Sequence, residues 1–211
     1  MNSDSVESRL SQRAADVEYS AIRKMFERAN QLDANNLVHL EIGEPDFDTP
    51  DHIVEAAHEA AASGGTHYTS TAGLPELRAA IANRPNGTGS FDPESEVVVT
   101  TGAMEALYLT FQAVADPGDE VVVPTPAWPN YEMQIRLAGA TPVAVPLSPA
   151  DGFALDAERV AEAITNDTAA VVLCSPSNPT GQVYDMAAVS EVIDAAAAHD
   201  CYVVADEVYD G

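Results

Sequence analysis

The sequence has 211 residues, 46% of them hydrophobic, which is enough for one large domain or two small ones with a sizeable core. Its 34 acidic residues outnumber 9 Lys and Arg and give a net charge of −25, so nucleic acid and anionic membranes are poor partners. The acidic residues are scattered along the whole chain, a pattern typical of a halophile's surface, with an ordinary acidic protein as the alternative.

No secretory leader or membrane anchor is predicted. The N-terminal stretch MNSDSVESRL has no apolar core, and no apolar run approaches the length of a bilayer span. The two cysteines, Cys174 and Cys201, lie in apolar runs and do not form a disulfide framework. We therefore expect a soluble cytoplasmic protein with reduced cysteines.

The first hundred residues predict helices joined by loops. Apolar residues recur at helical spacing in residues 20–33, and a short strand-like run follows at 37–42. Two more helices are expected at 51–63 and 74–82, and the stretch NRPNGTGS after them is turn material.

From residue 96 onward, strands and helices alternate. Strands are expected at 96–101, 119–124, 141–147, 169–175 and 201–207, and helices at 102–116, 129–139, 156–164 and 185–200. The strands are continuous apolar runs, which a parallel sheet covered on both faces requires. The predicted fold class is therefore α/β, with three α/β/α layers and a mainly parallel sheet.

Ligands of open parallel sheets bind beyond the carboxyl ends of the strands, so the residues that follow each strand are the candidates. The motif TTGAMEA leads from a strand into a helix, whose free N–H groups suit a phosphate; an ordinary turn is the alternative. Trp128, the only tryptophan, lies in the loop PAWPNY. A tryptophan is usually a core residue, but at this edge its ring could stack on a flat ligand.

Two further motifs bring polar groups to the same edge. SPSNPTG surrounds Asn178, whose amide could donate to a ligand oxygen, although a structural turn also explains the motif. Asp206 ends the last strand, where a carboxylate is costly unless it meets a cation or hydrogen-bond donors. Tyr209 follows three residues later. In isolation, an N-cap aspartate beside a surface tyrosine is the simpler interpretation.

Several motifs occur together and in one order: EIGEPDFDTP, HYTSTAGLPELRAAI, TTGAMEAL, DPGDEVVVPTPAWPNY, SPSNPTG and ADEVY. In this order they resemble the N-terminal half of a pyridoxal-phosphate-dependent aminotransferase of class I/II, the aspartate aminotransferase fold type. The resemblance covers residues 20–211 almost without interruption. It implies that residues 1–48 form an N-terminal arm and small-domain segment, and that 49–211 form part of the large cofactor-binding domain.

The resemblance implies a role for each candidate. Asp206 pairs with the pyridinium nitrogen of pyridoxal 5'-phosphate and keeps the ring an electron sink. The other cofactor contacts are the backbone N–H groups of Gly102, Ala103 and Met104 at the phosphate, Trp128 on the ring face, and Asn178 and Tyr209 at the phenolic oxygen. Substrate contacts fall to Gly43, Trp128 and Asn178. Tyr68 reaches the phosphate of a neighbouring subunit, which implies a homodimer.

The family's Schiff-base lysine has no counterpart here. Lys24 is the only lysine, and it is predicted to be a solvated residue of the first helix. We therefore expect an incomplete fragment without a catalytic residue of its own and without a metal site. The full-length protein is expected to move an amino group between an L-amino acid and a 2-oxo acid.

Three other functions are considered beside the aminotransferase. One is another reaction of the same cofactor and fold, such as that of a lyase, decarboxylase or synthase. Another is a non-catalytic chain that binds a phosphate ligand or serves as a dimerisation module. An unrelated nucleotide-binding domain is disfavoured, because TTGAMEA is not a G-x-G-x-x-G turn and no P-loop lysine exists.

Overall fold

The structure is a computed structural model that describes residues 9–15, 17, 21–32, 38–40, 43–84 and 91–209. The chain forms two compact units, one of residues 19–99 and one of residues 1–18 together with 100–211. Among the described residues, no helix combines the length and apolar character that a bilayer span requires. The proposed division at residue 48 stays a prediction.

The unit of residues 19–99 contains three helices among its described residues: α3 (Ala21–Asn30), α4 (Asp51–Ala62) and α5 (Pro75–Ala82). None of the residues of α4 is buried. Helix α5 is fixed by Arg78, which is buried and whose Nη1 donates to the carbonyl oxygens of Pro93 (2.8 Å) and Glu94 (3.3 Å). The predicted helices at 51–63 and 74–82 are thus confirmed.

The two strands predicted before residue 102 are not found as strands in the described residues. The strand at 37–42 falls partly outside the described residues, and 38–40 are not in a strand. The predicted strand at 96–101 is wrong, because 96 and 101 are bends and residues 97–100 have no regular structure. The Val99 N–H donates to the Ala72 carbonyl at 2.9 Å. A segment of high strand propensity becomes a strand only where a neighbouring strand pairs with it through a ladder of backbone hydrogen bonds.

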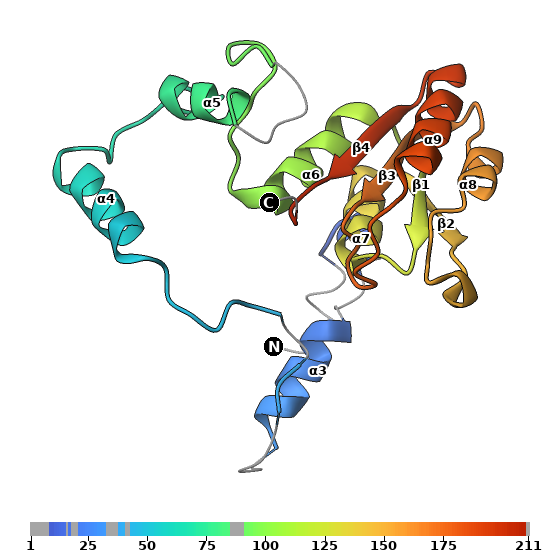
Figure 1. Ribbon diagram of the computed structural model, residues 1–211, viewed down its shortest axis with the longest axis horizontal. Coiled ribbons are helices and arrows are strands. Elements are labelled where there is room, and N and C mark those ends of the chain that lie inside the picture. Colours follow the sequence, from blue (N-terminus) through green and yellow to red (C-terminus); the bar gives the residue numbers. More distant parts are fainter. Residues whose placement is uncertain are drawn as a thin grey trace. The chain divides into compact units, whose positions relative to one another are not determined.

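The second unit alternates strands and helices as predicted (Figure 1). Short helix α2 (Gln12–Ala15) belongs to this unit and contacts α7. The remaining elements, in chain order, are α6 (Gly102–Val114), β1 (Glu120–Thr125), α7 (Pro129–Ala138), β2 (Thr141–Pro146), η1 (Pro149–Asp151), α8 (Ala157–Ala163), β3 (Thr168–Cys174), α9 (Met186–Ala198) and β4 (Tyr202–Asp206).

Within the described part of the chain, the four strands form one sheet in the order β2-β1-β3-β4, and every pair is parallel. The strands predicted at 119–124, 141–147, 169–175 and 201–207 are thus confirmed and form one parallel sheet. The central strands β1 and β3 are almost continuously buried, which explains their unbroken apolar runs. All four strands therefore end at one edge, followed by the loops that carry the candidate residues.

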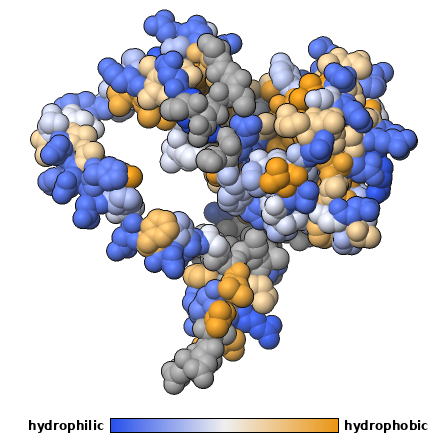
Figure 2. Space-filling view, viewed as in Figure 1, coloured by the Kyte–Doolittle hydropathy of each residue, from blue (hydrophilic) through white to orange (hydrophobic). Residues whose placement is uncertain are grey.

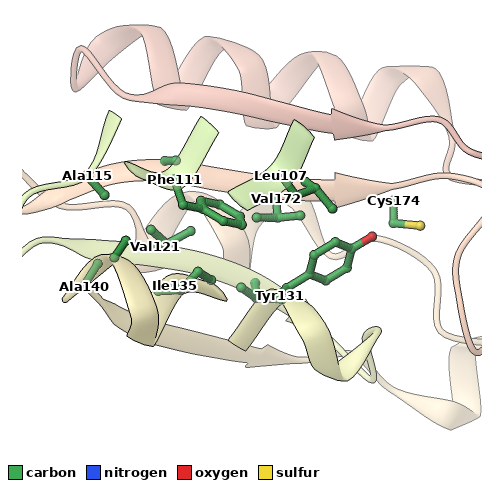
Figure 3. Packing of buried hydrophobic residues seen from close by; sticks show 12 residues of the cluster. Leu107, Phe111, Ala115, Val121, Tyr131, Ile135, Ala140, Val172 and Cys174 are labelled. Carbon is green, nitrogen blue, oxygen red and sulfur yellow. The ribbon is translucent and has the colours of Figure 1, made fainter. Parts of the chain in front are cut away.

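Alternate residues of each strand face two separate cores. On one face, Val121 and Val172 pack with Phe111 of α6 and Ile135 of α7 (Figure 3). On the other face, Val122 and Val171 belong to a cluster with residues of α8 and α9. Both faces of the sheet are thus covered by helices, and the three-layer α/β/α architecture is confirmed.

Candidate functional site

Asp206 lies at the carboxyl end of β4, opposite Cys174 at the end of β3. One carboxylate oxygen, Oδ2, accepts a hydrogen bond from the Tyr131 hydroxyl at 2.6 Å. The other, Oδ1, accepts from the Val208 N–H at 3.2 Å. The carboxylate is half-buried and forms no salt bridge within the described residues. Two neutral donors therefore orient a negative charge that has no cationic partner there.

Tyr131 donates this hydrogen bond from helix α7, which packs on one face of the sheet. It belongs to the third position of α7, is 2% exposed, and packs in the core formed with α6 (Figure 3). Burial, followed by the hydrogen bond to Asp206, raises the pKa of this phenol well above its ordinary value. The Cys174 thiol beside the hydroxyl acts in the same direction on that pKa. Tyr131 is therefore held as a neutral donor.

Asn178 and Tyr209 form a second polar pair. The Asn178 side-chain amide donates to the Tyr209 hydroxyl at 3.2 Å. The loop of Asn178 is closed on itself, because the Ser177 N–H donates to the Gln182 carbonyl (2.9 Å) and the Gly181 N–H to the Ser177 carbonyl (2.8 Å). A turn built in this way fixes the backbone at Asn178, so the structural interpretation of SPSNPTG is confirmed, and the ligand contact of Asn178 stays a prediction.

Trp128 is half-buried and forms the N-cap of α7. Its ring meets the Tyr131 ring edge-on, with centroids 5.5 Å apart and planes at 81°. Such an edge-to-face pair is a favourable aromatic geometry and fixes the orientation of the indole. Tyr131 thus contacts both Trp128 and Asp206.

The first turn of α6 carries the predicted phosphate site. Gly102 has φ +73°, a left-handed conformation that glycine adopts without strain, and no side-chain cap from Thr101 covers the helix start. Residues 102–104 are exposed, as a ligand contact needs. The Thr101 N–H is already used by the Glu105 carboxylate at 2.5 Å, a bond that lowers the pKa of Glu105.

Helix α7 holds this turn from the side. Asn130 Nδ2 lies 3.2 Å from the Met104 sulfur, and Gln134 Nε2 donates to the Met104 carbonyl at 3.1 Å. Gln134 is 2% exposed, and its Oε1 has no hydrogen-bond partner in the described structure. Met104 is therefore tied to the same helix that carries Tyr131.

Most candidates thus belong to one compact unit and are linked by direct contacts. The links run from Trp128 through Tyr131 to Asp206, and from Asn178 to Tyr209. Tyr68 and Gly43 belong to the other unit, where both are exposed. Tyr131, Gln134 and Glu105 were not predicted from the sequence. Tyr131 had one usable signal, its place in the first turn of a helix that starts directly after a strand-end loop.

Comparison with known proteins places this arrangement in a family. The model of the family "Aminotransferase class I and II" matches residues 35–211. The chain belongs to that family. Its members use pyridoxal phosphate, so the family, fold type and cofactor class predicted from the motifs are confirmed.

Relatives with assigned names are aminotransferases. The chain is 47% identical over 206 residues to a probable aspartate/prephenate aminotransferase of Thermus aquaticus, a match that covers 95% of this chain and 53% of the relative. It is 39% identical over 202 residues to an aspartate aminotransferase of Pyrococcus horikoshii, covering 95% and 51%. The chain therefore spans about half the length of the curated relatives it matches.

Solved structures agree. An aspartate aminotransferase from Thermus thermophilus, solved with maleate, matches with a TM-score of 0.89 at 44% identity, covering 94% of this chain and 53% of that one. An alanine aminotransferase from Pyrococcus furiosus matches with a TM-score of 0.89 at 36% identity, covering 96% and 53%. These likenesses confirm the fold predicted from the motifs.

The residues present fit the family's cofactor. A half-buried carboxylate with two neutral donors, and with no cationic partner among the residues that the structure describes, suits a protonated ring nitrogen, which would supply a positive charge. An amide and a phenol suit an anionic ring oxygen, and an uncapped helix start suits a phosphate. All of these groups belong to one unit of the structure.

Proposed function

We propose that the full-length protein is a pyridoxal-phosphate-dependent aminotransferase that moves an amino group between an L-amino acid and a 2-oxo acid. The observation that carries this proposal is Asp206, held at the end of β4 by Tyr131 in a chain that belongs to the aminotransferase class I and II family. The cofactor, when bound, supplies an electron sink for the bonds at the substrate's α-carbon.

Each predicted residue has a role in this proposal. Asp206 holds the proton on the ring nitrogen, since a carboxylate favours the charged form of a neighbouring base. Asn178 and Tyr209 donate hydrogen bonds to the ring oxygen, and Trp128 covers one ring face and excludes water from it. The N–H groups of Gly102, Ala103 and Met104 bind the phosphate at the start of α6.

Substrate binding and the covalent link to the cofactor need further residues. Gly43, Trp128 and Asn178 are proposed to contact the substrate. Lys24 is exposed on α3, and we assign it no role in the reaction. We propose that the lysine that binds the cofactor comes from a part of the protein beyond these 211 residues, because the matched relatives are about twice as long.

A homodimer is also proposed. Tyr68 is fully exposed in the single chain, which supports its predicted role at the phosphate of a neighbouring subunit. The dimer would then complete two equivalent sites, each with a tyrosine from its partner.

The cellular setting proposed is the cytoplasm of a high-salt cell. The net charge of −25 supports it, and Figure 2 shows hydrophilic residues over much of the visible surface. Reduced cysteines agree with it as well, since Cys174 and Cys201 are both free thiols. Neither nucleic acid nor a membrane is a proposed partner.

The test is Asp206→Asn in the full-length protein, with Asp194→Asn on the exposed face of α9 as the matched control. The amide keeps the shape but not the charge, so turnover with amino-acid and oxo-acid pairs should fall about 100-fold or more, the scale of one preorganised electrostatic contact. The control should retain full turnover. Near wild-type turnover of the Asp206 variant would refute the proposal.

A further inference from the structure

The hydroxyl of the buried Tyr131 donates a hydrogen bond to a carboxylate, that of Asp206, and core packing alone does not require a charged acceptor. A buried tyrosine needs one partner for its hydroxyl, and a backbone carbonyl or a water would serve. Tyr131 instead donates at 2.6 Å to the carboxylate at the end of β4. Bonds from a neutral donor to an ionised acceptor are shorter and stronger than neutral pairs.

The bond restricts the rotation of the carboxylate. The Val208 N–H binds Oδ1 at 3.2 Å, a longer contact from a turn residue that is itself exposed. Tyr131 binds Oδ2 from a buried helix position, and its ring is held by Trp128 on one side. Of the two donors, only Tyr131 is therefore anchored in the core.

The hydroxyl of Tyr131 lies beside the ends of two neighbouring strands. In Figure 3 the hydroxyl of Tyr131 points toward Cys174, which is buried at the end of β3 and directs its own thiol to the Pro176 carbonyl at 3.3 Å. Cys174 is also the residue opposite Asp206 in the strand register. The phenol thus lies near the ends of β3 and β4 and donates to the carboxylate of Asp206.

We infer that Tyr131 is a positioning residue of the cofactor site: it holds the Asp206 carboxylate in the orientation that binds the ring nitrogen. This inference rests on the proposed function and assigns Tyr131 no contact with the cofactor or the substrate. It acts through Asp206 and fixes Trp128 with the same ring.

The test is a double-mutant cycle in the full-length protein, because a residue that acts through another loses its effect when that other is removed. The variants are Tyr131→Phe, Asp206→Asn and the pair. Phenylalanine keeps the ring that packs on Trp128 and removes only the hydroxyl. Tyr184→Phe is the matched control, since Tyr184 is a buried tyrosine of the other core.

Two readouts are combined. Turnover of Tyr131→Phe should fall roughly tenfold, the scale of one charge-assisted hydrogen bond, and by less than about twofold when Asp206→Asn is already present. The nitrogen-15 resonance of ring-labelled pyridoxal phosphate should move toward its position in Asp206→Asn. The thermal unfolding temperature of the apo protein should fall no more in Tyr131→Phe than in Tyr184→Phe. In Tyr184→Phe the ring-nitrogen resonance should stay at the wild-type position.

The outcomes separate two failures. An unchanged resonance and turnover in Tyr131→Phe, beside a strong effect of Asp206→Asn, would overturn the inference and leave the proposed function intact. An equal loss from Tyr131→Phe in both backgrounds would show a purely structural role. If Asp206→Asn itself leaves the ring-nitrogen resonance at the wild-type position, the proposed function fails as well.

Discussion

The Asn178 amide and the Tyr209 hydroxyl lie 3.2 Å apart, although the two residues follow different strands and are 31 positions apart in the sequence. The pairing brings two hydrogen-bonding side chains together from the loops that follow β3 and β4. Asn178 has a second N–H on its amide and Tyr209 its own O–H, so both can still donate to one ligand oxygen.

Tyr209→Phe in the full-length protein should raise the pKa of the ionisation seen in the absorption of the bound cofactor. The hydroxyl favours the anionic ring oxygen, so its loss favours the protonated form. Spectrophotometric pH titration measures this. Tyr202→Phe, at an exposed tyrosine on β4, is the control and should leave the titration unchanged. A titration of Tyr209→Phe that coincides with wild type would exclude contact with that oxygen.

Trp128→Ala should weaken retention of pyridoxal phosphate by about tenfold, because stacking and edge-to-face contacts are each worth about 0.5–1.5 kcal/mol. Trp128→Phe should keep part of the affinity, since a smaller ring remains. Equilibrium dialysis gives both dissociation constants. If the alanine variant binds as tightly as wild type, Trp128 is only a core residue at the start of α7.

Tyr131 and Tyr184, two of the seven tyrosines, should ionise only above the ordinary pKa of a tyrosine, about 10. Burial is the largest cause of the raised pKa in both. A pKa raised by folding adds stability that is fully present below the unfolded value, about 10, and is lost as the pH rises above it. The tyrosinate absorbance of these two residues should therefore appear only well above about pH 10, together with unfolding. Ionisation of all seven tyrosines at about pH 10 in the folded protein would contradict this.

The 211-residue chain should form no specific covalent adduct when mixed with pyridoxal phosphate and reduced with borohydride. Lys24 is its only lysine, and it is exposed on α3. Mass spectrometry of peptides would locate any adduct. Lys24→Arg serves as the control for background labelling, and stoichiometric modification at Lys24 in the unsubstituted chain would overturn our assignment.

Added potassium chloride should raise the thermal unfolding temperature of the full-length protein steeply between about 0.1 and 1 M. Over that range the screening length falls from about 10 Å to about 3 Å, which weakens repulsion within a surface of net charge −25. Differential scanning calorimetry measures the change. An equal concentration of glucose should not reproduce it, and a flat response to salt would remove the support for a high-salt setting.

The sheet could be predicted from the sequence because its strands depend on burial. Unbroken apolar runs such as 119–124 and 169–175 match β1 and β3, which are covered on both faces. Residues 96–101 have the same local pattern and form no strand, because a strand also needs a neighbour. Local composition contains no information on which neighbour is present.

The candidate site was predictable where a residue departs from its surroundings. Asp206 after an apolar strand and Trp128 in a proline-rich loop both stand out. Tyr131 does not, since an aromatic residue on the inner face of a helix is the ordinary content of a core. Its hydroxyl gains a role only through the folded position of Asp206, 75 residues later. Gln134 was not predictable for the same reason, because its contact with Met104 depends on how α6 and α7 pack.

Strand β4 has one neighbour in the described structure, since the order β2-β1-β3-β4 leaves it at an edge. Its register is therefore set by β3 alone, through the pairs from Ala170↔Tyr202 to Cys174↔Asp206. Edge strands open locally more readily than central ones, so the amides of β4 should exchange with deuterium faster than those of β1 and β3. The Asp206 carboxylate is therefore carried by an edge strand, and an element that pairs with the free edge of β4 would slow the local opening that displaces this carboxylate.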